Sequence, residues 1–342
     1  MNISQWVRPN IQALKPYSCA RDEFKGEAKA FLDANENPFG APYNRYPDPR
    51  QVALKKKIAQ LKYVRPTQIM LGNGSDEPID LTYRIFCEPG QDNAVGIAPS
   101  YGMYSVCADI NNVEYREVPL EENFELNARK VLAATDAHTK VIWCCSPNNP
   151  SGNLLNRNEL RTLLNEFNGM VVIDEAYIDF ADEPSWLTEL DNYPNLIVLQ
   201  TFSKAWAMAS VRCGMVFANE AVIDYYNKVK YPYNINLLTQ EFVARQIDNA
   251  GETQKRVAVI LQERGQVVAS LETLPCTRKV YPTDANFVLV EVTDANRIYE
   301  KLVEEAIVVR NRNTVLKCGN CLRITIGTPE ENRLLIDAMR KL

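Results

Sequence analysis

Short apolar runs alternate with stretches of helical character along most of the first two thirds of the sequence, and this alternation limits the fold more than any other feature. The runs expected to form strands are 68–71, 93–98, 114–118, 139–145, 170–173, 196–201 and 211–218. Several are apolar throughout, which is typical of strands covered on both faces. Helices are expected between them, at 78–86, 101–110 and 157–168. The pattern predicts an α/β fold with a mostly parallel sheet covered by helices.

The pattern changes after residue 234. A long helix is expected over 237–269, with short strands and helices after it. The later strands are expected at 278–281, 286–290, 307–309 and 321–326, and the later helices at 295–305 and from 330. A length of 342 residues agrees with more than one domain. We expect an N-terminal arm with part of a small domain at 1–30, a large domain at 31–234 and a smaller α+β domain at 235–342.

The charge balance argues against polyanionic partners. The chain carries 38 basic and 43 acidic residues, for a net charge of −5. The run Lys55-Lys56-Lys57 is interpreted as an exposed helix face. Neither nucleic acid nor a membrane surface is expected as a partner. No apolar stretch reaches the roughly 18 residues that a membrane span needs.

Cysteine and histidine usage gives little support for a metal site. Cys144 and Cys145 are adjacent in an apolar run, and no signal peptide is evident, so reduced thiols and a cytoplasmic location are expected. Cys318 and Cys321 have metal-ligand spacing but no second pair, and the one histidine, His138, is distant in sequence. We expect no metal, and the single histidine, interpreted as a surface residue, excludes a histidine-based triad.

Lys204 follows directly after the apolar run 196–201. A lysine becomes a covalent catalyst when its pKa is lowered and a carbonyl group is held beside it. Taken alone, this placement would sooner indicate a surface lysine at the start of a helix. Asp174 ends another apolar run, and a buried carboxylate needs a partner such as a protonated pyridine nitrogen. Tyr177 could donate a hydrogen bond to a phenolate oxygen on the same ring. Alternatively, Asp174 could simply cap a helix.

Two loops add to this pattern. The turn 146–152 contains Asn149, which such a turn can direct toward a ligand. The segment 72–76 places glycines between a strand and a helix, where backbone N–H groups can approach a phosphate. Arg212 could pair with the same phosphate through two hydrogen bonds. Each feature alone could be a plain loop, but together they stand at the ends of different strands of one sheet, where a cofactor pocket can form.

These motifs resemble those of the fold-type I aminotransferases. The segment 146–152 is similar to their Asn-Pro-[Thr/Ser]-Gly turn, and the segment 174–177 to their Asp-x-x-Tyr motif. Ser203-Lys204 followed by Arg212 is similar to their cofactor signature. More narrowly, the sequence resembles the histidinol-phosphate aminotransferase family nearly from end to end. The segments that carry this resemblance are 8–10, 16–17, 33–38, 44–47, 99–104, 284–287, 308–310 and 321–327.

The resemblance implies pyridoxal 5′-phosphate as cofactor, held by Lys204 as a Schiff base in the large domain. The implied catalytic residues are Lys204, Asp174 and Tyr177. The other implied cofactor contacts are Gly74, Ser75, Asp76, Tyr101, Asn149, Thr201, Ser203 and Arg212, with Tyr46 reaching in from the neighbouring subunit of a homodimer. The implied substrate contacts are Tyr17, Asn35, Arg310 and Arg323.

The implied activity is transfer of an amino group from L-histidinol phosphate to 2-oxoglutarate, giving imidazole-acetol phosphate and glutamate in histidine biosynthesis. Two arginines could hold the substrate phosphate and the carboxylates of glutamate. Three alternatives remain open: an aminotransferase for aromatic or other amino acids, a threonine-phosphate decarboxylase, and a non-catalytic binding module. The sequence departs from the family pattern at Ser151, Trp206 and Ala209-Ser210, and none of these changes removes a catalytic group.

Overall fold

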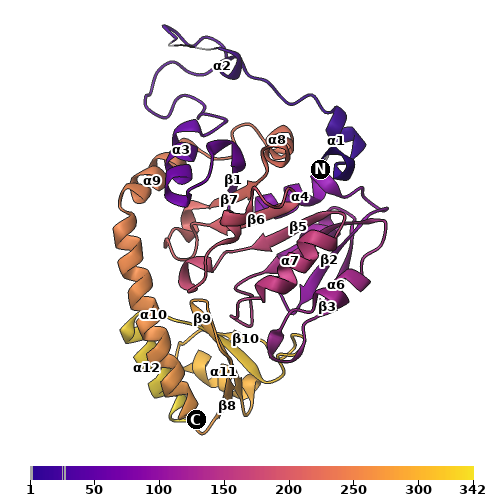
Figure 1. Cartoon of the computed structure of the whole chain (residues 1–342). Helices are drawn as coiled ribbons and strands as arrows, with labels where there is room; N and C mark the ends of the chain where they lie inside the picture. The colour runs from indigo at the N-terminus through magenta and orange to yellow at the C-terminus, as the bar shows by residue number, and fades with distance from the viewer. Residues whose placement is uncertain (1–2, 25, 27) are drawn as a thin grey trace.

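A seven-stranded sheet forms the centre of the computed structural model, which describes residues 3–24, 26 and 28–342 (Figure 1). The strand order is β1-β7-β6-β5-β4-β2-β3. Only β7 runs antiparallel to its neighbours in this sheet, so the expectation of a mostly parallel α/β sheet is confirmed. The strands are β1 (Ile69–Asn73), β2 (Asn93–Ala98), β3 (Glu114–Pro119), β4 (Thr139–Cys145), β5 (Met170–Asp174), β6 (Leu196–Thr201) and β7 (Cys213–Ala218).

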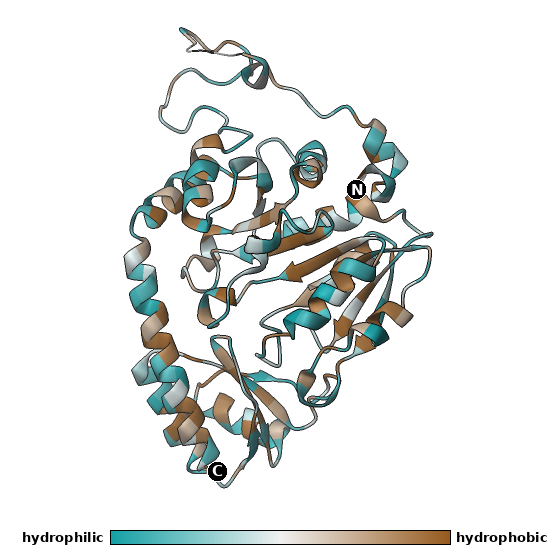
Figure 2. Cartoon of the chain, viewed as in Figure 1, coloured by the Kyte–Doolittle hydropathy of each residue, from teal (hydrophilic) through white to brown (hydrophobic). Residues whose placement is uncertain are grey.

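Both faces of the central part of this sheet are covered, which explains why several of its strands are apolar throughout. Successive residues of β5 alternate between two cores, with Val171 and Ile173 in one and Val172 in the other. Figure 2 shows the central strands as mostly hydrophobic. The helices in this part of the chain are α3 (Val52–Lys62), α4 (Asp76–Phe86), α5 (Met103–Ile110), α6 (Ala128–Ala133), α7 (Arg157–Glu166) and α8 (Glu220–Val229).

A second, antiparallel sheet lies toward the C-terminus, with the order β10-β11-β9-β8. Its strands are β8 (Thr277–Val280), β9 (Phe287–Val292), β10 (Arg310–Asn311) and β11 (Cys321–Thr325). The helices α10 (Ala250–Glu272), α11 (Ala295–Glu304) and α12 (Pro329–Met339) accompany it (Figure 1). One face contributes Phe287 and Leu289 to a core shared with the large sheet, while Val288 and Val290 pack in a separate core on the other face.

Two element predictions in this half are wrong. The expected helix over 237–269 is two helices, α9 (Leu237–Asp248) and α10, because Asn249 has non-helical backbone angles and its N–H bonds back to Gln246. The strand expected at 307–309 is absent. Ala306 adopts a left-handed conformation and the N–H of Ile307 bonds to Leu302 at the end of α11, so the pairing begins only at β10.

The interpretation of the lysine run as an exposed face is wrong for Lys55. Its side chain is buried on α3, whereas Lys56 is exposed. Burial lowers the pKa of Lys55 to about 8, and the positive charges of Lys230 and Arg50 lower it further.

The N-terminal segment carries α1 (Pro9–Ala13) and α2 (Ala20–Glu23) and extends away from the rest of the chain around α2 (Figure 1). Glu36 fixes part of it by accepting hydrogen bonds from Arg21, from Arg45 and from the backbone N–H of Tyr46. These donors lower the pKa of Glu36 to about 2. Across the described residues, no helix is both long and apolar enough to cross a membrane.

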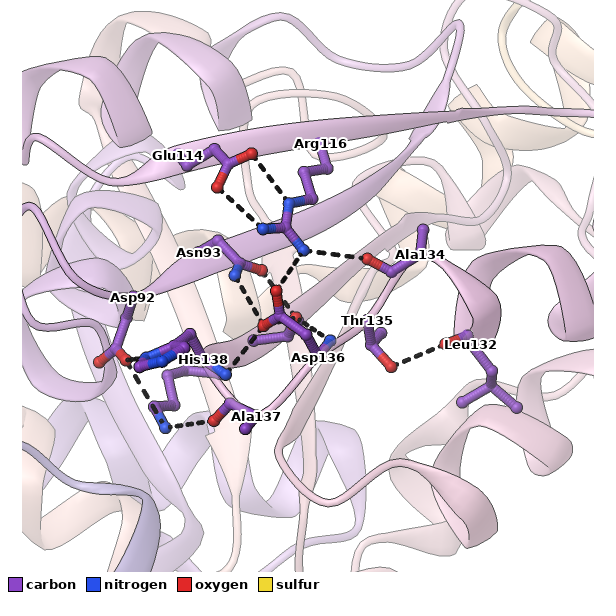
Figure 3. A network of polar contacts seen from close by, with 12 residues as sticks. Asp92, Asn93, Glu114, Arg116, Leu132, Ala134, Thr135, Asp136, Ala137 and His138 are labelled. Atoms are coloured by element: carbon purple, nitrogen blue, oxygen red, sulfur yellow. Dashed lines mark hydrogen bonds and ion pairs between the residues drawn. The ribbon is translucent and has the colours of Figure 1, made fainter.

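His138 lies just before β4 with an exposed side chain, as expected, and within a polar network at the amino ends of β2 and β4 (Figure 3). Its Nδ1 is 3.7 Å from a carboxylate oxygen of Asp92. Asp136 accepts hydrogen bonds from Asn93 and Arg116 in the same network, and these donors lower its pKa. The network joins loops at the strand ends opposite to those that carry Lys204.

Candidate active site

A cavity of about 140 Å³ opens at the carboxyl ends of β4, β5 and β6. Parallel strands bring the residues that follow them to one edge of the sheet, which is where ligands bind in α/β folds. Most residues named from the sequence for the cofactor line this cavity. They are Ser75, Asp76, Tyr101, Asn149, Asp174, Tyr177, Thr201, Ser203, Lys204 and Arg212. Cys145, Ala176 and Ala209 also line it and were not named as cofactor contacts from the sequence.

Lys204 projects into this cavity from the turn after β6. Its Nζ lies 5.5 Å from the centre of the Tyr177 ring. Surrounding protein removes water from the ammonium group, and the positive charge of Arg323 repels it, so the pKa of Lys204 is lowered. A lowered pKa increases the fraction of neutral amine, which is the nucleophilic form.

Asp174 is buried at the end of β5. One carboxylate oxygen accepts a hydrogen bond from the Tyr104 hydroxyl at 2.7 Å, and the other accepts one from the Ala176 N–H at 3.0 Å. Burial raises the pKa of Asp174, while the two donors oppose that shift. The carboxylate is therefore held in place on the cavity wall and would be stabilised by a cationic partner.

Tyr104 was not predicted as a functional residue. It lies on α5, its ring stacks on Trp143 with centroids 4.9 Å apart, and it is completely buried. The only sequence signal was its position three residues after Tyr101, which can place both rings on one side of a helical turn. The two rings do meet edge to face, with centroids 5.6 Å apart.

One end of the cavity gathers groups suited to a phosphate. Arg212 pairs with Asp76 at 3.3 Å, and Asp76 also accepts a hydrogen bond from the Tyr101 hydroxyl at 3.0 Å. Thr201 and Ser203 place their hydroxyls 3.0 Å apart beside them. Three hydroxyl or guanidinium donors next to the N-terminus of α4 fit the oxygens of a phosphate monoester.

Gly74 allows the Arg212 side chain to lie close to the backbone. Its φ of +72° is a conformation that side chains disfavour, and a Cβ there would lie 2.2 Å from an Arg212 guanidinium nitrogen. Its N–H donates to the Arg212 carbonyl at 3.0 Å. The glycine therefore fixes the backbone beside Arg212 while leaving room for its side chain.

The small sheet contacts the cavity wall at Asn149. Arg323 on β11 donates to the Asn149 side-chain oxygen at 2.6 Å and lies over the Phe287 ring at 5.3 Å. Arg310, on β10, is directly opposite Arg323 and is exposed. Because Arg323 occupies the Asn149 oxygen, the Asn149 amide NH₂ is the group left to donate into the cavity.

Six residues named from the sequence are not among those that line the cavity of their own chain: Gly74, Arg310, Arg323, Tyr17, Asn35 and Tyr46. Tyr17, Asn35 and Tyr46 are exposed on the N-terminal segment. Tyr46 instead stacks on Tyr233 with ring centroids 4.5 Å apart.

The fold and the strand-end site define a class of protein. Residues 23–339 match the family model for aminotransferase class I and II, and the chain belongs to this family. Within it, the chain falls among the histidinol-phosphate aminotransferases. The histidinol-phosphate aminotransferase of Bacteroides thetaiotaomicron is 54% identical over 340 residues, covering 99% of this chain and 98% of that protein.

Solved structures show the same fold. The histidinol-phosphate aminotransferase of Clostridium acetobutylicum superposes with a TM-score of 0.81 at 25% identity, covering 87% of this chain and 90% of that one. The enzyme of that name from Sinorhizobium meliloti, in complex with pyridoxal 5′-phosphate, gives a TM-score of 0.78 at 22% identity. It covers 90% of this chain and 89% of that one.

Proposed function

We propose that this protein transfers the amino group of L-histidinol phosphate to 2-oxoglutarate, in histidine biosynthesis, with pyridoxal 5′-phosphate bound at Lys204. The observation that carries the proposal is that Lys204, Asp174 and a phosphate-binding group of donors line one cavity. The names of relatives that match the chain from end to end support the choice of substrate.

The residues of the cavity fit this cofactor. The buried Asp174 carboxylate suits a pyridinium nitrogen, and the donors Ser75, Thr201, Ser203 and Arg212 suit its phosphate. When bound, the cofactor supplies an aldehyde that condenses with amines and a protonated ring that accepts electron density from the substrate Cα. Tyr101, at the cavity wall, would lie against the ring.

Asp174 would keep a proton on the ring nitrogen of the cofactor. A carboxylate in a water-poor site stabilises an adjacent cation strongly, and Tyr104 holds this carboxylate in one orientation. Tyr177 and the Asn149 amide would donate hydrogen bonds to the phenolate oxygen of the cofactor. These donors lower the pKa of the group they contact and orient the ring.

Lys204 moves the proton. With cofactor and substrate bound, the neutral amine of Lys204 would be placed to take the proton from the substrate Cα and to return a proton to the reacting group. The lowered pKa of Lys204 favours the neutral form that this step requires. The charge of Arg323 contributes to the lowered pKa of Lys204. The arginine proposed to bind the substrate therefore also favours the neutral, basic form of Lys204.

The substrate anion would be held by Arg323 and Arg310 on the small sheet. Guanidinium groups bind phosphate and carboxylate oxygens in paired hydrogen bonds, so one site can serve histidinol phosphate in one half-reaction and glutamate in the other. Tyr17 and Asn35 would complete this end of the site.

We also propose a cytoplasmic homodimer in which Tyr46 serves the partner's cavity. The N-terminal segment extends from the body and exposes large apolar side chains, among them Phe24, Phe31 and Phe39 (Figure 1). All nine cysteines are free, as expected in a reducing compartment.

Mixing Lys204→Ala and Tyr46→Ala chains would test whether Tyr46 of one subunit completes the active site of the other. Hybrid dimers would regain one intact site, and mixtures no more active than their components would contradict it.

The activity is tested by measuring glutamate formation from histidinol phosphate and 2-oxoglutarate. Glutamate should form only when both substrates are present, with no release of carbon dioxide. Carbon dioxide release without consumption of the keto acid would instead identify a decarboxylase.

A further inference from the structure

Arg312 is a third arginine beside the substrate end of the cavity, and neither the sequence motifs nor the cavity lining singled it out. It follows β10, two residues after Arg310, and residues two apart in an extended strand lie on the same face. Arg323 is directly opposite Arg310 on β11. All three side chains therefore share one face of the small sheet.

That face is turned toward the large sheet. Leu322 and Ile324, which alternate with Arg323 along β11, pack in the separate core on the far side. Cys321, on the Arg323 face, belongs to the core shared with the large sheet. The positive charges of Arg312 and Arg323 both act on the Tyr177 phenol in the cavity wall.

The three arginines have no acidic counterpart. Within the described part of the chain, no carboxylate lies at ion-pair distance from any of them, and the Nε atoms of Arg312 and Arg323 are buried without a hydrogen-bond partner. Burial lowers the pKa of both guanidinium groups, and the charge of Arg310 lowers it further. Like charges facing each other across a ladder are destabilising, so this cluster would be stabilised by a bound anion.

The backbone fixes Arg312 in position. Its N–H donates to the Cys321 carbonyl at 2.9 Å, and its own carbonyl accepts from the Val315 N–H at 2.9 Å. Asn313 and Asn320 close the same loop with a bond of 2.7 Å. The guanidinium group therefore starts from an ordered backbone, which reduces the entropy lost when it binds a ligand.

We propose that Arg312 is a specificity-determining residue which, with Arg310 and Arg323, favours a dianionic phosphate ester over a monoanionic carboxylate at the substrate end of the site. The inference rests on the proposed function. A third positive charge attracts a dianion about twice as strongly as a monoanion at the same distance. A phosphate also offers three acceptor oxygens, enough for more than two guanidinium groups.

The test compares the two half-reactions on one preparation of the cofactor-loaded dimer. Single-turnover rates would be measured with histidinol phosphate and with glutamate for the wild type, Arg312→Gln and Arg312→Lys. Arg297→Gln, an exposed arginine on α11, removes the same charge away from the site and serves as control. The Gln variant should lose about tenfold in the second-order rate constant of the single turnover with histidinol phosphate, mainly through a higher half-saturating concentration, and about threefold or less with glutamate. The Lys variant should recover part of the loss.

The ratio of the two rates is unaffected by the fraction of protein that is folded. A ratio unchanged from wild type in Arg312→Gln would overturn the inference while leaving the proposed function intact. A wild type that reacts with glutamate but not with histidinol phosphate would remove the proposed function instead. Inorganic phosphate then still tests the anion site: it should inhibit the glutamate reaction about tenfold less well in Arg312→Gln, and equal inhibition would overturn the inference.

Discussion

The two ends of the cavity differ in whether their charged side chains have partners in the protein. At the cofactor end, Arg212 is paired with Asp76, and Asp174 is held by Tyr104. At the substrate end, Arg323 has only the neutral Asn149 as a side-chain hydrogen-bond partner in the described structure, and Arg310 has no acid opposite it.

The difference matches the residence time expected of each ligand. A resident cofactor benefits from a preformed and rigid site, because the ordering cost is met once during folding. An exchanging substrate benefits from a site whose charge is balanced only when the substrate is bound. The following predictions separate the two ends by their effects on cofactor affinity, KM and kcat.

The largest expected effect is that of Asp174→Asn. The substitution removes the negative charge that we propose keeps the ring nitrogen of the cofactor protonated, and kcat should fall by about 10³-fold. Steady-state glutamate formation measures the loss. Asp182→Asn, on the exposed loop beyond, is the control and should leave kcat unchanged. A fall of less than tenfold would show that Asp174 does not act on the ring.

Replacing an arginine by glutamine should change a different measured parameter at each end of the cavity. Arg323→Gln removes the charged donor that we propose for the substrate anion, and it should lower kcat/KM about 10²-fold, mainly by raising KM for both substrates. Arg212→Gln should instead weaken binding of the cofactor by a similar factor, measured by equilibrium titration after dialysis. If both variants changed the same parameter, the division of the cavity into two ends would be wrong.

Gly74→Ala tests the crowding at the phosphate end. An added Cβ must displace the Arg212 side chain, and the left-handed backbone disfavours alanine, so cofactor affinity should fall about tenfold. Gly102→Ala has no atom within 4 Å of its Cβ and an ordinary backbone, and it should bind the cofactor normally. Equal affinities in the two variants would contradict the assigned crowding.

The smallest expected effect is that of Tyr104→Phe. The change removes one donor that lowers the pKa of Asp174, so that pKa should rise and the acid limb of the kcat profile should move to higher pH. At neutral pH, kcat should fall by about tenfold or less. Tyr83→Phe removes a buried hydroxyl that bonds the Tyr104 carbonyl and serves as control. If the acid limb stayed at the same pH, Tyr104 would only pack beside Asp174 and would not affect its pKa.

The sequence was sufficient to predict the sheet and to name most of the residues that line the cavity. Continuous apolar runs identified the strands, and polar residues directly after them, such as Asp174 and Lys204, meet at one edge because the strands are parallel. The break at Asn249 was missed because the helical pattern continues on both sides of it.

The remaining misses depend on tertiary contacts. Lys55 follows the polar pattern of a surface helix, and only the packing of α3 shows it to be buried. Tyr104 bonds to Asp174, which lies on a strand far away in sequence. Arg312 is placed near Arg323 by the register of β10 against β11. No local property of the sequence specifies either relationship.

The central claim is that Lys204 reacts with the same substrate that the arginines of the small sheet bind. A single-turnover absorbance measurement tests this claim most directly. Cofactor-loaded enzyme would be mixed with histidinol phosphate alone, then with 2-oxoglutarate. The absorbance of the bound cofactor should change to that of its amine form and return on addition of the keto acid, with no change in Lys204→Ala. An unchanged spectrum with histidinol phosphate, in a preparation that responds to another amino acid, would contradict the account.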